Sequence, residues 1–179
     1  MYGLVNRAIE GLVCEKFGKE SWQNICRRAG LGDPSFLAME AYDDAITYSL
    51  VGAASAELGL DPAAILEAFG TYWTSYTIEE GYGDLLSMMG NTLEDFLDNL
   101  DSMHTRVGGT MPELVPPSFD REPQPDGSSI LHYRSEREGL APMVLGLLKG
   151  LAQRFDVKIH IEQLEPAGKG HERFMVRRA

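Results

Sequence analysis

Residues 129–155 read SILHYRSEREGLAPMVLGLLKGLAQRF, and the hydrophobic period changes near the middle of this stretch. Apolar and polar residues alternate from Ser129 to Ser135, which is the period of a half-buried β-strand. After Pro142 the period becomes helical, because apolar residues recur at every third or fourth position. The apolar residues at this spacing are Val144, Leu147, Leu148, Leu151 and Phe155. The stretch therefore predicts a strand followed by a helix.

The chain before this stretch has helical patterns, and the chain after it has strand patterns. Asp61 and Pro62 are typical of a helix start, with an N-cap followed by proline at the first helical position. We expect helices over 5–17, 22–29, 42–58, 62–76 and 85–89, one helix from Asn91 or Thr92 to about Val107, and a connecting loop rich in glycine and proline over 108–128. Strand-like alternation returns over 157–164 and 172–177. Helices followed by a strand–helix–strand–strand order predict an α+β fold.

Charge and composition disfavour nucleic acid and membranes as partners. The formal net charge of the 179 residues is −11, which repels phosphate backbones and anionic lipid surfaces. No apolar run approaches the roughly 20 residues of a spanning helix. Asn6, Arg7 and Glu10 interrupt the first apolar stretch, so a signal peptide is not expected. Cys14 and Cys26 form no CxxC pair and indicate reduced core thiols in a cytoplasmic protein.

One histidine is predicted to lie on an apolar helix face. With Leu93 set to zero on a helical wheel, His104 falls at about 20°, in the middle of the apolar residues of the same helix. Two interpretations remain open. The imidazole is either a core side chain with satisfied ring nitrogens or, as a buried neutral base, a ligand for iron.

A polar triplet occupies alternate positions of the predicted strand. Tyr133, Ser135 and Arg137 are spaced by about 6.6 Å, so their donors suit a ligand that carries two carboxylates. The alternative is the solvated face of a half-buried strand.

No competing catalytic motif is present. The sequence has no GxGxxG, Walker, HExxH or GxSxG motif and no metal-spaced cysteine pairs. The other histidines and the acidic pairs are expected at the surface, namely His132, His160, His171, Asp43–Asp44 and Glu79–Glu80.

The order of these signals resembles the H-NOX family of haem–nitric oxide/oxygen binding domains. A helical histidine in LDSMHTRVG precedes a proline-containing loop and then YxSxR. The similarity also covers MYGLVNRAIEGLV, AFGTYWTSYT and GLAPMVLGLLKGLAQRF, and it is strongest to the cyanobacterial-type members that exist as free-standing domains. The resemblance implies a single haem domain over 1–179, with one haem b buried between a helical lobe (about 1–60) and a clamping lobe with an antiparallel sheet (about 61–179).

The resemblance also implies roles for individual residues. His104 would be the proximal iron ligand, and Tyr133, Ser135 and Arg137 would hold the propionates. Pro112 would press on the porphyrin, and Trp73 and Met143 would lie on the gas-binding side. Members that hold oxygen stably have a tyrosine hydroxyl where this chain has Met143.

The implied function is a non-enzymatic, cytoplasmic sensor of nitric oxide and carbon monoxide. After the sensor no residues remain for an output domain, so a separate partner is expected, either a histidine kinase or a cyclic-di-nucleotide enzyme. Release of His104 would be the trigger. One alternative is a haem enzyme such as a peroxidase, but neither Trp73 nor Met143 can shuttle protons. Another is a pocket that binds a small apolar molecule without haem.

Overall fold

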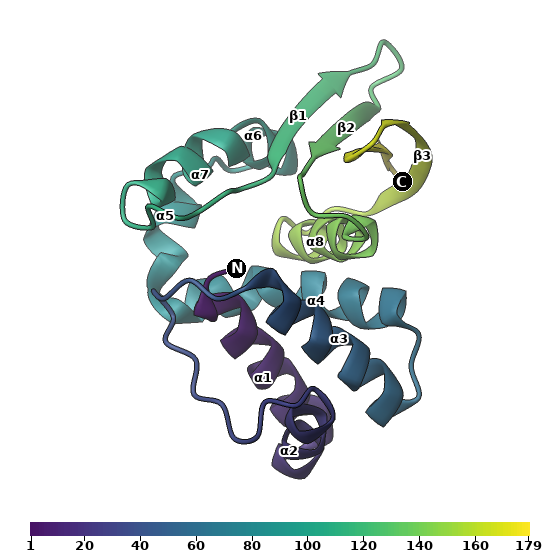
Figure 1. The fold of residues 1–179 in the computed structure, drawn as a ribbon. Coiled ribbons are helices and arrows are strands. Elements are labelled where there is room, and N and C mark those ends of the chain that lie inside the picture. The colour runs from purple at the N-terminus through teal and green to yellow at the C-terminus, as the bar shows by residue number, and fades with distance from the viewer.

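The computed structural model describes the whole chain, Met1–Ala179. In Figure 1, α8 lies between the sheet and α4, and α1–α3 lie on the far side of α4. The elements are α1 (Gly3–Phe17), α2 (Lys19–Arg28), α3 (Asp44–Leu58), α4 (Pro62–Thr77), η1 (Ile78–Tyr82), α5 (Gly83–Ser87), α6 (Leu93–Asp98), α7 (Leu100–Gly108), β1 (Ser118–Pro123), β2 (Ser129–Arg134), α8 (Ala141–Arg154), β3 (Ile159–Gly168) and β4 (His171–Arg178). The predicted α+β class is confirmed.

The predicted helix boundaries are confirmed where the sequence carries a cap. The Asp61 carboxylate accepts the Ala63 N–H at 2.8 Å, and Pro62 is the first residue of α4. Gly59 ends α3 in the left-handed region, with φ of 64°. The Thr92 hydroxyl accepts the Asp95 N–H at 3.1 Å at the start of α6. Side-chain capping and a left-handed glycine thus determine where these helices begin and end.

The single helix expected from residue 91 or 92 to 107 is wrong, because the structure divides it into α6 and α7. Asn99 separates them, with φ of −99° and ψ near 0°. The Asn99 side-chain amide donates to the carbonyl oxygens of Met89 and Asp95. These bonds hold asparagine in a local turn that competes with a continuous helix.

The four strands form one antiparallel sheet in the order β1-β2-β4-β3. The expectation of a loop over all of 108–128 is wrong for Ser118–Pro123, which form β1 and pair with β2. β1 is an edge strand, so only one of its sides needs partners and Pro123 is tolerated at its end. Phe119 is its one buried side chain, which is too little to give a strand pattern in the sequence.

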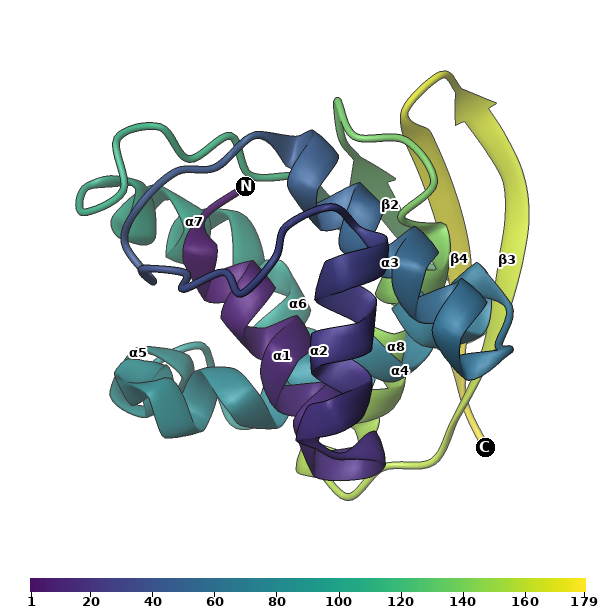
Figure 2. The same ribbon diagram turned by 60° about the horizontal axis from the view of Figure 1, so that its bottom comes forward.

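The interior contains two hydrophobic cores. The first joins α1–α4 and includes Ile9, Trp22 and Leu50. The second joins the sheet, α6 and α8 and includes Leu93 and Phe174. In Figure 2, α1–α3 lie toward the viewer and β3 and β4 form the right-hand edge.

Glycines bring α4 and α8 into backbone contact between these cores. A Cβ atom on Gly70 would lie 2.1 Å from the Met143 carbonyl oxygen, and one on Gly146 would lie 2.0 Å from the Glu67 carbonyl oxygen. The Thr71 hydroxyl donates to the Gly146 carbonyl at 3.1 Å. Only glycine permits this close approach.

None of the helices taken singly has both the length and the apolar composition needed to cross a membrane. The segments Asp44–Leu58 and Pro62–Ser87 meet those criteria only as a pair, with a bend of 113° between them. α4 continues into the π-helical segment η1, in which Gly81 has φ of 96°.

Candidate functional site

A largely apolar cavity of about 330 Å³ lies among α1, α3, α4, α6, α7, α8 and β2. Of the 41 residues that line it, 31 are hydrophobic. Both cores contribute to its walls, so the cavity is enclosed only when the two halves of the molecule pack together. Its shape and composition are typical of a site for a mostly apolar ligand.

His104 projects from α7 into this cavity. Its Nδ1 is buried and has no hydrogen-bond partner. Burial lowers the pKa of the imidazole, and the Asp101 carboxylate and the Pro117 carbonyl oppose this only in part. The ring is therefore neutral at pH 7 and keeps a lone pair for a metal ion.

Tyr133, Ser135 and Arg137 also line the cavity. β2 ends at Arg134, so only Tyr133 belongs to the strand, and the other two lie in the loop that follows it. Burial raises the pKa of the Tyr133 phenol, which therefore stays protonated. The Ser135 hydroxyl accepts the Arg137 backbone N–H at 3.0 Å. The three residues place two hydroxyls and one guanidinium beside the apolar walls.

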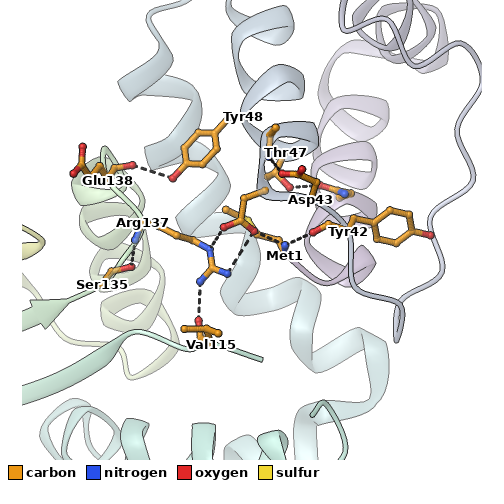
Figure 3. Close-up of polar contacts among 12 residues, drawn as sticks. Met1, Tyr42, Asp43, Thr47, Tyr48, Val115, Ser135, Arg137 and Glu138 are labelled. Carbon is orange, nitrogen blue, oxygen red and sulfur yellow. Dashed lines mark hydrogen bonds and ion pairs between the residues drawn. The ribbon is translucent and has the colours of Figure 1, made fainter. Parts of the chain in front are cut away.

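The Arg137 guanidinium lies at the edge of the cavity beside the chain's first residue (Figure 3). It donates to the Val115 carbonyl at 2.7 Å and, through Nε, to the Asp44 carboxylate at 2.7 Å. The Met1 amino group pairs with the same carboxylate. The expectation of a solvated helix end at Asp44 is wrong, because its carboxylate pairs with Arg137 and with the Met1 amino group. The sequence carries no signal for its pairing with Arg137, which is 93 positions away.

Replacing Asp44 with asparagine is expected to destabilise the protein at neutral pH but not in acid. Burial alone would raise the pKa of Asp44, but bonds and charges from Met1 and Arg137 outweigh it and lower that pKa. The stabilisation is therefore complete above the unfolded pKa and is lost as the pH falls through the lower folded pKa.

The side chain is 35% exposed, and solvent screening limits the effect at pH 7 to about 1 kcal/mol. Urea unfolding of wild type and Asp44→Asn between pH 7 and pH 3 measures it, with Asp120→Asn, an exposed carboxylate, as control. A difference that stays constant with pH would contradict this assignment.

Trp73 and Met143 both line the cavity, whereas Pro112 does not. Pro112 is exposed, and the prolines in the lining are Pro116 and Pro117. The structure therefore does not place Pro112 in the cavity lining, and its contact with a cofactor stays a prediction without structural support. Pro112 lies between two residues of the lining, Met111 and Glu113, but is itself exposed to solvent. Pro117 takes its place as the candidate, since its carbonyl also influences His104.

The α4 wall offers few free hydrogen-bond donors. The Thr74 and Thr77 hydroxyls donate to the helix carbonyls of Thr71 and Trp73, each at 2.9 Å. The Trp73 indole N–H makes no hydrogen bond, and the ring packs against Phe69 and Tyr76 with centroids 5.8 and 6.2 Å away. Met143 has no donor. The indole N–H is thus the one donor on this wall that is not engaged.

These residues fit a haem. The cavity supplies apolar walls, one half-buried imidazole with a buried, unsatisfied Nδ1, and a guanidinium with two hydroxyls near its edge. A haem needs a protein ligand for its iron, for which a neutral imidazole is suitable, and polar partners for two propionates.

Comparisons with known proteins agree with this assignment. A model of the family described as "Haem-NO-binding" matches residues 2–163. Soluble guanylate cyclase gcy-35 of Caenorhabditis elegans is 35% identical over 164 residues, covering 89% of this chain and 24% of the cyclase. Guanylate cyclase soluble subunit beta-2 of Rattus norvegicus is 36% identical over 113 residues, covering 59% of this chain and 17% of that protein. The chain thus spans about a quarter or less of the length of these curated relatives.

Solved structures show the same fold. An H-NOX protein from S. oneidensis in the Fe(II)NO ligation state has a TM-score of 0.88 at 21% identity and covers 100% of this chain and 99% of its own. An oxygen-binding H-NOX domain related to soluble guanylate cyclases, in its oxygen complex, has a TM-score of 0.81 at 20% identity, with 99% and 94% covered.

Proposed function

The chain belongs to the haem–NO-binding (H-NOX) family of haem-based gas sensors, and from this premise we propose that it senses nitric oxide and carbon monoxide through one ferrous haem b. The observation that carries the proposal is the half-buried, neutral His104 imidazole in an apolar cavity, with a buried Nδ1 that has no hydrogen-bond partner. When bound there, the haem supplies the iron at which small gases bind.

Each group of cavity residues has its own proposed role toward the haem. His104 would donate a nitrogen to the iron, and Tyr133, Ser135 and Arg137 would hold the two propionates. Pro117 would contact the porphyrin, and Trp73 and Met143 would form the wall beside the gas. The apolar lining excludes water, which limits oxidation and strengthens the polar contacts at the edge.

The proposed signal is a movement of His104. Binding of nitric oxide would free the His104 side chain, and α7 could then shift. α7 follows directly after α6, whose residues pack in the second core, and α4 packs in the first. A shift of α7 would therefore move the part of the molecule built around the second core against the part built around the first, and the α4–α8 contact joins these two parts.

The response is proposed to pass to a separate partner in the cytoplasm, either a histidine kinase or a cyclic-di-nucleotide enzyme. The H-NOX domain itself acts as a sensor rather than as a catalyst. A peroxidase activity has no support, because neither Trp73 nor Met143 provides an acid–base group beside the iron position.

Anaerobic optical titration of the reduced protein tests the gas selectivity. We expect a Soret band that shifts with nitric oxide and with carbon monoxide, and no stable new spectrum in air. Bound oxygen gains from a hydrogen-bond donor, which Met143, Thr74 and Thr77 do not offer. Trp73→Phe is the matched variant, since it removes the remaining donor and should change nothing. A persistent oxygen-dependent spectrum that Trp73→Phe abolishes would show that the indole is a donor and would overturn the selectivity.

A further inference from the structure

Arg154 contributes to the cavity at the end farthest from Arg137. It is the last residue of α8, and its side chain lines the same cavity as Leu140, which immediately precedes α8. α8 has 14 residues, so the two ends of this wall are about 20 Å apart. The cavity therefore has a guanidinium near each end of α8, and the one at Arg154 has no part in the proposed haem contacts.

The Arg154 guanidinium has no polar partner. It makes no hydrogen bond and no ion pair, although the chain has 27 aspartates and glutamates. Arg106 and Arg134 are likewise unpaired, but both are exposed to solvent, whereas Arg154 is half-buried. The remaining arginines each have a carboxylate, amide or carbonyl partner. A half-buried cation without a partner is costly, so it is a candidate for an external anion.

Two aromatic rings hold the guanidinium. Its central carbon lies 5.6 Å from the Phe96 ring centroid and 5.8 Å from that of Phe155. These contacts use the face of the guanidinium and leave its N–H edge free to donate. The position of Arg154 in the last turn of α8 also favours a positive charge through the helix dipole. The helix dipole of α8 accounts for a positive charge at this position, but it provides no acceptors for the N–H groups of the Arg154 guanidinium.

We propose that Arg154 forms a second binding site, at the end of the cavity away from Arg137, for a small planar monoanion such as nitrite or a short carboxylate. One guanidinium neutralises one negative charge, and its fork matches two oxygens in a plane. The neighbouring side chains of Phe96 and Leu151 have no polar groups, so a dianion such as sulfate would lack donors. The site goes beyond gas sensing, and its formation does not depend on a haem.

Titration by ¹H–¹⁵N NMR tests the site in the protein as purified. Sodium nitrite, formate and sulfate are added separately at constant ionic strength, balanced with sodium chloride. The signals followed are the Arg154 Nε–H and the backbone amides of Phe96 and Phe155. Arg154→Gln removes the charge, and Arg154→Lys keeps the charge without the fork. Arg106→Gln is the matched control, because Arg106 is an unpaired arginine in the last turn of α7 that does not line the cavity.

Nitrite or formate, or both, should give saturating one-site curves in the wild type and in Arg106→Gln, and sulfate should not. Arg154→Gln should weaken the affinity by about tenfold or more. The affinity of Arg154→Lys should lie between those of the wild type and Arg154→Gln. Shifts that never saturate in the wild type, or an unchanged curve in Arg154→Gln, would overturn the proposal. No gas or haem spectrum enters this readout, so its failure is distinct from failure of the sensor assignment.

Discussion

Replacing His104 with glycine is expected to lower the amount of haem that copurifies with the protein by roughly tenfold or more. Loss of a group that merely orients a metal ligand typically costs 10–100-fold in metal affinity, and loss of the ligand itself should cost at least as much. The cavity offers no second imidazole, because His132, His160 and His171 do not line it. Added imidazole should restore haem retention, since glycine leaves space for it in the apolar pocket.

The measurement is the ratio of haem to protein, with the Soret band recorded at increasing imidazole concentration. His160→Gly is the matched control, because His160 is exposed on β3 and should retain the wild-type ratio. An unchanged ratio and spectrum in His104→Gly without imidazole would show that another group binds the iron.

Gly146→Ala is expected to be the most destabilising small substitution, at about 3 kcal/mol or roughly 10 °C in Tm. The added Cβ would lie 2.0 Å from the Glu67 carbonyl oxygen and 2.9 Å from the Thr71 nitrogen. Both atoms are backbone atoms of α4, so no rotamer change relieves the overlap and α4 and α8 must separate. Because Trp73 and Met143 lie on these two helices, the gas side of the cavity would also widen.

The matched control is Gly52→Ala, at an exposed site within α3 where an added Cβ meets nothing within 4 Å. The free energy of unfolding of that variant should rise by about 0.5–1 kcal/mol, because alanine is a better helix former than glycine. Thermal unfolding of the two variants distinguishes the effect of helix propensity on Tm from the effect of the steric overlap at Gly146. If both variants shifted Tm in the same direction, the close contact of α4 and α8 would not be a source of stability.

The sequence predicts the elements whose signals are local. Asp61, Thr92 and Gly59 mark helix ends through their own backbone geometry, and the period change within 129–155 places β2 and α8. It does not predict β1, since an edge strand with one buried residue has no pattern of its own. It also misses the turn at Asn99, which depends on a bond to Met89 ten positions away.

The same distinction holds for the candidate site. His104 can be found from helical spacing, and the triplet Tyr133, Ser135 and Arg137 from its alternation, and the structure places all four in the cavity lining. Their roles toward a haem stay predictions. Asp44 depends on a contact across 93 positions, and the choice of Pro117 over Pro112 depends on the path of a loop. Neither the Asp44–Arg137 contact nor the position of Pro117 in the lining can be predicted from the order of residues in the sequence.

The lining of the cavity begins at Met1 and ends at Arg154, and this range sets the earliest moment at which the pocket exists during biosynthesis. The first core uses residues up to Tyr76 and then only Met111, so most of it is available while the ribosome is still in the first half of the chain. Val144 and Leu148, on the wall formed by α8, are made much later. At roughly 5–20 residues per second, about 4–16 s pass between the synthesis of Tyr76 and the completion of α8 at Arg154. The nascent chain therefore carries an open apolar surface for that interval, and the supply of cofactor matters only after translation has passed residue 154.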